Sequence, residues 1–156
     1  MTIPHSLPVV GVLGAWLAIA QASAQATFTL EQVMGAPFAS GLTAAPKGAR
    51  LAWVLNSRGV RNIWVAQAPG YKARSVTRYD EDDGQEISGL TWTPDGESIV
   101  FVRGGAANRE GTYPNPLSNP AGAEQALWIV PVRGGEPRRL DEGASPAISP
   151  KGDRLV

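Results

Sequence analysis

The chain has 156 residues, the size of one ordinary domain and long enough to bury a core. Its 14 basic residues balance its 14 acidic ones, so its charge implies no nucleic-acid partner and no anionic membrane surface. There are no cysteines, which excludes disulfides, thiolate zinc sites and a cysteine nucleophile.

The first residues have the pattern of an export signal. Residues 9–20 are apolar and uncharged, fewer than the roughly 20 residues that a membrane-spanning helix needs. Small residues follow directly, and we predict a signal peptide over residues 1–24, cleaved near Ala24 or Ala26. The mature chain is then periplasmic or secreted. No Lys or Arg precedes the apolar core, so an uncleaved N-terminal anchor or a mis-assigned start codon is the alternative.

Residues 25–38 are predicted to form a short helical lead-in. Thr29 and Gln32, three residues apart, match a capping box, and Gly35 is placed to end the helix. We expect one or two helical turns that pack against the body that follows.

From residue 39 the chain repeats itself. The turn at residues 46–48, Pro-Lys-Gly, returns as Pro-Asp-Gly at 94–96 and as Pro-Lys-Gly at 150–152. In each copy Pro presets φ for the first central position of a turn, and Gly accepts the positive φ that follows. The prolines recur at an interval close to the roughly 40–50 residues of a propeller blade, and an insertion lengthens the second interval.

Each complete copy contains four short runs that have the character of strands. One run precedes the turn, an apolar run follows it, a run containing Trp comes third, and a more polar run closes the copy. The last three lie at 51–54, 63–66 and 73–77 in the first copy, and at 99–102, 127–130 and 137–140 in the second. The links between them are too short and too rich in turn residues for the crossover helices of a parallel sheet.

The predicted fold class is therefore all-β, a β-propeller of four-stranded antiparallel blades. We place two blades at about residues 39–87 and 88–143, and an incomplete third at 144–156, so that residues 39–156 form a partial propeller. Propellers close with roughly 4–8 blades, so we expect the sequence to be a fragment of a longer protein.

The repeat resembles those of TolB-like propellers. Its best copy combines the turn at 93–96, the Trp-containing run at 127–130 and the sequence Gly-Gly-Glu-Pro-Arg-Arg-Leu at 134–140. The opening of the mature chain resembles bacterial serine peptidases of the prolyl oligopeptidase family, in particular the dipeptidyl aminopeptidase/acylaminoacyl-peptidase branch. The segments that carry this second resemblance, which extends over about residues 27–156, are 28–33, 44–48, 61–65 and 83–88.

This resemblance implies a propeller that shields the Ser-Asp-His triad of a following α/β-hydrolase domain and admits short peptides. The present sequence departs from that pattern because it has no G-x-S-x-G elbow, and its single histidine, His5, lies in the predicted signal peptide. We therefore assign it no catalytic, cofactor-binding or metal-binding residue, and we expect no cofactor.

The partners implied are the protein's own C-terminal hydrolase domain and short peptide substrates. We expect no nucleic acid and, after signal cleavage, no membrane contact. The alternative function is that of a non-enzymatic TolB-like periplasmic propeller that binds envelope proteins. A propeller enzyme with its site on the central channel, such as a lactonase, is disfavoured because the pattern of metal-binding carboxylates and histidines is missing.

Two polar segments are candidate binding sites. Asp80–Glu86 is rich in the oxygen ligands that suit calcium but lacks the spacing of a calcium loop, so we interpret it as a solvated connection between blades. The insertion Gly104–Gln125 exceeds the roughly 12–15 residues of ordinary loops. It is interpreted either as a functional loop, which lines a substrate entrance or contacts the hydrolase domain or another subunit, or as a disordered surface loop.

Several single residues are also candidates. Glu86, Glu110 and Glu124 could hold the amino terminus of a peptide, but no local motif supports this role and none is assigned it. Arg138 and Arg139 are interpreted as solvent-facing. The tryptophans at strand positions are interpreted as core between blades rather than as ligand-stacking groups: Trp53, Trp64, Trp92 and Trp128.

Overall fold

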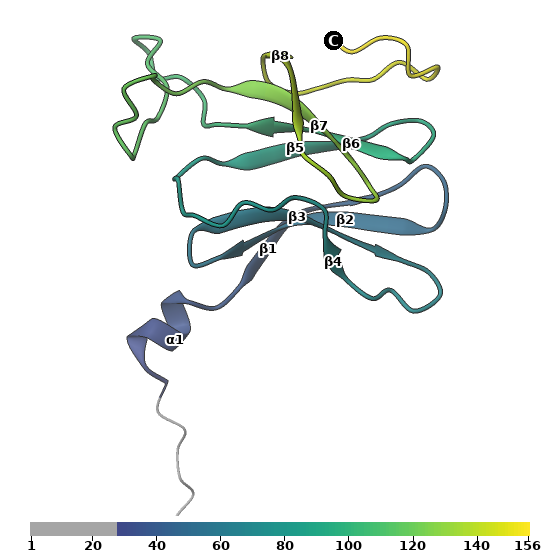
Figure 1. The fold of residues 1–156 in the computed structure, drawn as a ribbon, viewed down its shortest axis with the longest axis horizontal. Helices are drawn as coiled ribbons and strands as arrows, with labels where there is room; N and C mark the ends of the chain where they lie inside the picture. Colours follow the sequence, from purple (N-terminus) through teal and green to yellow (C-terminus); the bar gives the residue numbers. More distant parts are fainter. Residues whose placement is uncertain (1–27) are drawn as a thin grey trace, which may run out of the picture.

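The structure is a computed structural model that describes residues 28–156, so the predicted signal peptide and its cleavage sites lie outside the described residues. A short helix precedes two four-stranded antiparallel sheets, which lie one above the other in Figure 1. The elements are α1 (Leu30–Met34), β1 (Phe38–Ala44), β2 (Arg50–Ser57), β3 (Val60–Gln67), β4 (Arg74–Ser75), β5 (Ile87–Trp92), β6 (Ser98–Arg103), β7 (Ala126–Pro131) and β8 (Arg138–Glu142).

The strands follow one another in each sheet in chain order, β1-β2-β3-β4 and β5-β6-β7-β8. This four-stranded antiparallel meander is the architecture of a propeller blade, and it confirms the predicted fold class. After β8, Ile148 pairs with Leu155 in an antiparallel bridge. Ala147 and Val156 also exchange backbone hydrogen bonds of 2.8 and 2.9 Å, so the chain forms a further hairpin around the third Pro-x-Gly turn.

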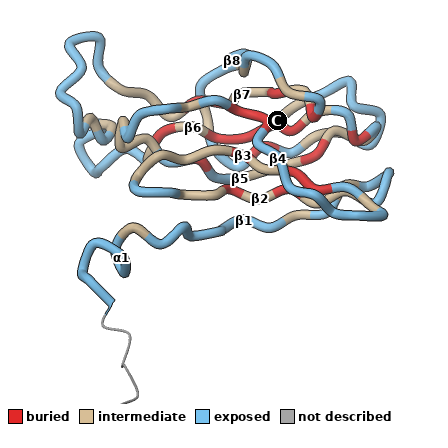
Figure 2. Tube along the Cα trace, turned by 60° about the horizontal axis from the view of Figure 1, so that its bottom comes forward, coloured by how far each residue is buried: buried red, intermediate tan, exposed pale blue. Residues whose placement is uncertain are grey.

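The predicted capping box of the lead-in helix is confirmed, and its predicted packing is wrong. The Gln32 backbone N–H donates to Thr29 Oγ1 at 3.2 Å, and the Thr29 N–H donates to Gln32 Oε1 at 2.9 Å. However, no residue of α1 is buried, and Leu30 is 72% exposed. Figure 2 shows α1 standing clear of the sheets. The capping bonds join residues that are close in sequence, so they stabilise the helical turn by themselves. Packing also needs a neighbouring apolar surface, and the described residues do not place one beside α1.

The Pro-x-Gly turns join the first two strands of each unit, as predicted, and they stack on one another. Gly96 has φ +74°, which glycine adopts without strain. The Arg50 guanidinium donates to the Gly96 carbonyl oxygen at 2.5 Å and pairs with Glu97 at 2.9 Å. Arg50, beside the first turn, therefore binds the second turn, and this contact fixes the position of one sheet relative to the other at this end.

The core lies between the two sheets, where the alternation of each strand turns one set of side chains inward. Phe101 lies within this core and is fully buried. Strand β6 is buried on both faces because it is central in its sheet and because the segment after β8 lies near its other side, where Ile148 and Leu155 line a pocket together with Val100. The buried core residues are Ala52, Val54, Ile63, Val65, Val76, Ile87, Trp92, Ile99, Phe101, Val130 and Val132.

The interpretation of the tryptophans as core between blades holds for only part of the set. Trp92 is buried in the core, and Trp128 packs against it. Trp53 and Trp64 lie directly opposite each other on β2 and β3, and both are only half-buried. They point away from the second sheet because Ala52 and Val54, their neighbours on the strand, point toward it.

Candidate functional site

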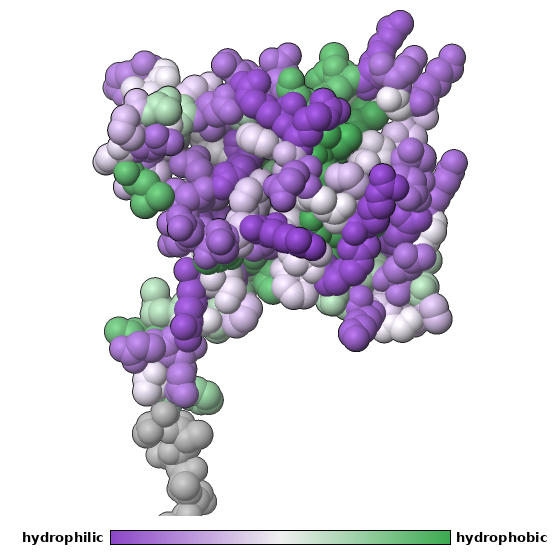
Figure 3. All heavy atoms as spheres, viewed as in Figure 1, coloured by the Kyte–Doolittle hydropathy of each residue, from purple (hydrophilic) through white to green (hydrophobic). Residues whose placement is uncertain are grey.

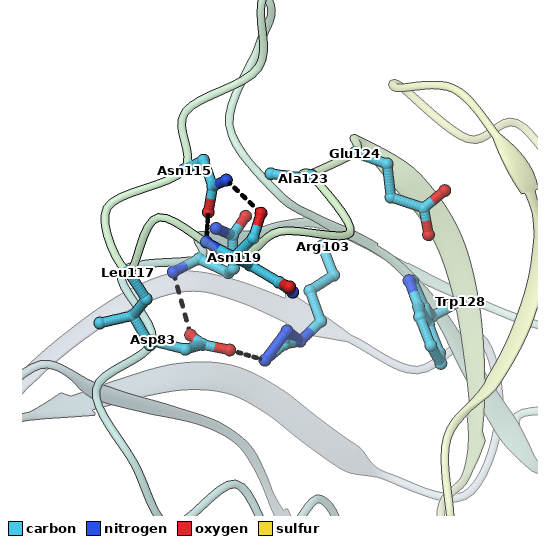
Figure 4. A pocket seen from close by; sticks show the side chains of 10 residues that line it. Asp83, Arg103, Asn115, Leu117, Asn119, Ala123, Glu124 and Trp128 are labelled. Atoms are coloured by element: carbon cyan, nitrogen blue, oxygen red, sulfur yellow. Dashed lines mark hydrogen bonds and ion pairs between the residues drawn. The ribbon is translucent and has the colours of Figure 1, made fainter.

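A polar cavity of about 280 Å³ lies where the insertion between β6 and β7 folds back over the second sheet. One wall is the connection between β4 and β5, and another is the start of β7 (Figure 4). The cavity is lined by Asp83, Gln85, Arg103, Asn115, Leu117, Asn119, Gly122, Ala123, Glu124 and Trp128.

Hydrogen bonds hold the insertion over this cavity. Gln85 Nε2 donates to the Pro114 carbonyl oxygen at 3.3 Å, which ties the insertion to the β4–β5 connection. Within the insertion, Asn115 Nδ2 donates to the Asn119 carbonyl oxygen at 2.9 Å, and Asn115 Oδ1 accepts from the Asn119 N–H at 2.9 Å. The insertion is thus a folded loop with its own polar contacts, although it has no helix or strand.

The floor of the cavity is an arginine held from two sides. Arg103, on β6, forms an ion pair with Asp83, and its guanidinium lies 4.1 Å from the centre of the Tyr79 ring. Burial raises the pKa of Tyr79 above its ordinary value, and the nearby Arg103 partly opposes this shift. Asp83 is therefore turned inward. The interpretation of Asp80–Glu86 as a solvated connection holds only for the other carboxylates of that run.

An amide network anchors the same connection beneath the cavity. Asn62 Nδ2 donates to the Tyr79 carbonyl oxygen at 2.8 Å, and Asn62 Oδ1 accepts from the Tyr79 N–H at 2.9 Å and from the Thr77 hydroxyl at 2.7 Å. Thr77 is buried, and its hydroxyl also accepts from the Ile63 N–H at 2.9 Å. Because these bonds join β3 to the β4–β5 connection, they set the position of the Tyr79 ring and hence of Arg103.

At the rim, Glu124 is paired with Arg139 of β8. Arg139 Nη2 lies 2.6 Å from Glu124 Oε2, and Arg139 Nε lies 2.9 Å from Glu124 Oε1. The hydrogen bond from Arg139 lowers the pKa of Glu124, so this carboxylate is ionised and already engaged at neutral pH. Arg139 is exposed, as interpreted, but it also makes this ion pair. Glu86 and Glu110 are exposed and do not line the cavity, so the structure does not bring the three glutamates together there.

The insertion starts at a glycine whose conformation the cavity depends on. Gly104 has φ +104°, and a Cβ there would overlap the Glu124 carbonyl oxygen. We expect Gly104→Ala to lower the free energy of unfolding by about 2–3 kcal/mol, because it adds strain and displaces the base of the insertion. Urea denaturation followed by circular dichroism measures this loss.

The control is Gly122→Ala, at a glycine that also has positive φ but has open space around it. It is expected to cost only about 1 kcal/mol. Equal losses for the two variants would contradict the close approach of Glu124 to Gly104.

Within residues 28–156, no three or more histidine, aspartate or glutamate side chains gather in a way that would hold a metal ion. The described part of the chain also has no helix that is both long and apolar enough to cross a membrane.

Similarity to known proteins is found among solved structures. No family model matches the sequence, and no curated protein matches it. Among solved structures, the chain is similar to TolB from Acinetobacter baumannii, with a TM-score of 0.33 and 16% sequence identity over 74% of this chain. The chain spans 36% of the length of that TolB chain.

Proposed function

We propose that this chain is the N-terminal propeller portion of an exported serine peptidase that hydrolyses short peptides. In this proposal it gates access to an α/β-hydrolase active site that a further part of the protein supplies. Residues 28–156 contain no histidine, so they offer no Ser-His pair, and they act by shielding and positioning.

The observation that carries the proposal is the exposed apolar turn at α1. Phe28, Leu30, Val33 and Met34 are all exposed, and no residue of α1 is buried against the sheets. Figure 3 shows these apolar side chains at α1 interspersed with polar ones. Exposed apolar side chains gathered on one short segment are typical of a surface that another structure covers. In this proposal, the protein's own hydrolase domain covers that surface.

The arrangement of the connections supports the same proposal. Antiparallel strands alternate in direction, so α1, the β2–β3 turn, the β4–β5 connection and the β6–β7 insertion all lie at one end of the sheets. Figure 1 shows α1 and the insertion on the same side. This end therefore combines the apolar turn with the polar cavity. Such a surface suits contact with a second domain whose active site a peptide must reach.

The alternative is a non-enzymatic TolB-like periplasmic propeller that binds envelope proteins. It accounts equally for the stacked four-stranded sheets, and it requires no hydrolase domain. The two proposals therefore differ in what the gene encodes after the codon for Val156.

The test is to sequence the gene past that codon and to purify the whole encoded protein from the periplasm. We expect further Pro-x-Gly units, then a G-x-S-x-G elbow followed by Asp and His, and a serine that a fluorophosphonate probe labels. We also expect cleavage of short chromogenic peptides and none of a folded protein substrate. A reading frame without the elbow, or a protein that the probe does not label, would reject the peptidase and leave the binding propeller.

A further inference from the structure

We propose that the cavity beneath the insertion binds a small neutral saccharide. The inference does not depend on the proposed function. It follows from the charge balance of the cavity, from the hydrogen-bonding groups that line it and from its tryptophan (Figure 4).

The charges of the cavity favour a neutral ligand. Asp83 is paired with Arg103, and Glu124 is paired with Arg139, so both carboxylates that line the cavity are already neutralised. A charged ligand would add net charge to a site whose two ion pairs already balance, and it would compete with them. Arg103 Nε is buried and has no hydrogen-bond partner among the described residues, so it is a donor that a neutral hydroxyl can use. A neutral polar ligand leaves both pairs intact.

The remaining polar groups form a mixed set of donors and acceptors. Within residues 28–156, no hydrogen bond is made by Asn119 Nδ2, Gln85 Oε1 or Trp128 Nε1. Two of these side chains are held in place by their other ends, since Asn119 Oδ1 accepts from the Ala121 N–H at 3.0 Å and Gln85 Nε2 donates to Pro114. Hydroxyl groups both donate and accept, so neighbouring sugar hydroxyls match such a fixed, mixed set.

Trp128 supplies the apolar surface that a sugar ring also needs. It extends from β7 beside Arg103 at the edge of the cavity, and its ring is half-buried because its inner part packs against the core (Figure 4). An aromatic ring presents an electron-rich face that suits the C–H groups of a sugar ring. The volume of about 280 Å³ lies near the lower end of the roughly 300–1,000 Å³ typical of small-molecule sites, so the ligand is small.

The test is a titration of the whole purified protein with glucose, galactose and N-acetylglucosamine, followed by calorimetry and by tryptophan fluorescence. We expect saturable binding of at least one of these sugars. Asn119→Asp keeps the oxygen that accepts from Ala121 but replaces the Nδ2 donor with an acceptor, so it should weaken that binding at least tenfold.

The matched control is Asn108→Asp, the same chemical change elsewhere in the insertion. Asn108 Oδ1 accepts from the N–H groups of Glu110 and Thr112, and Asn108 does not line the cavity. Its affinity for the sugar should equal that of the unmodified protein, and circular dichroism should show both variants folded. Absence of saturable sugar binding would overturn the proposal. So would an unchanged affinity in Asn119→Asp, or displacement of the sugar by a blocked alanine dipeptide with higher affinity.

Discussion

Phe101→Ala is expected to lower the free energy of unfolding by about 3–5 kcal/mol. The Phe101 side chain is 0% exposed and belongs to the core that joins the two sheets. Its removal loses apolar burial and leaves a cavity that the surrounding strands cannot fill, because each sheet is held in register by its own ladder of hydrogen bonds. Urea denaturation followed by far-ultraviolet circular dichroism measures the change.

Phe38→Ala is the matched control, since it removes the same side chain at the start of β1, where Phe38 is 69% exposed. A change within about 0.5 kcal/mol is expected for this surface position. Similar losses in the two variants would mean that the sheets do not bury Phe101 against each other in solution. That result would remove the basis for treating them as stacked blades.

Asn62→Ala is expected to cost about 2–4 kcal/mol, because three hydrogen bonds are lost together. The substitution removes both amide contacts to the Tyr79 backbone and the acceptor of the Thr77 hydroxyl. Since these bonds fix the connection that carries Tyr79 and Asp83, we also expect the Arg103 floor of the cavity to loosen. Urea denaturation measures the first effect, and hydrogen exchange of the Tyr79 amide measures the second.

Asn56→Ala is the control for this prediction. Asn56 Oδ1 accepts a hydrogen bond from the Gly59 N–H at 2.9 Å in the β2–β3 turn. The loss of a single bond in a surface turn should cost about 1 kcal/mol and leave the Tyr79 amide protected. If Asn62→Ala lowered the free energy of unfolding no more than this control, or left the Tyr79 amide equally protected, the Asn62 network would not be what positions the β4–β5 connection.

The outward face of the first sheet carries the two half-buried tryptophans, Trp53 and Trp64. Trp64 and Trp128 occupy equivalent positions in the two copies of the repeat. Trp128 faces the preceding sheet and packs against the core, whereas no sheet precedes that of Trp64 among the described residues. The partial exposure of Trp53 and Trp64 is therefore what a blade shows when the face toward its preceding neighbour is open.

The amino-acid sequence by itself determined the strands, the turns and the capped helix. These features depend on local pattern: apolar alternation along the strands, Pro and Gly at the turns, and Thr29 with Gln32 at the helix start. The same local patterns recur in both copies, so the predicted runs lie in β1–β8 or directly beside them, and the four-stranded units follow from them.

Only the tertiary structure decided the cavity, the position of α1 and the direction of each tryptophan. The insertion has no periodicity, and its position depends on contacts between residues distant in sequence, such as Gln85 with Pro114 and Glu124 with Arg139. Such contacts form because strands bring their ends together in space, and no neighbouring residue encodes them. For the same reason, the helix α1 can be predicted from its own residues, whereas whether it packs against the sheets cannot.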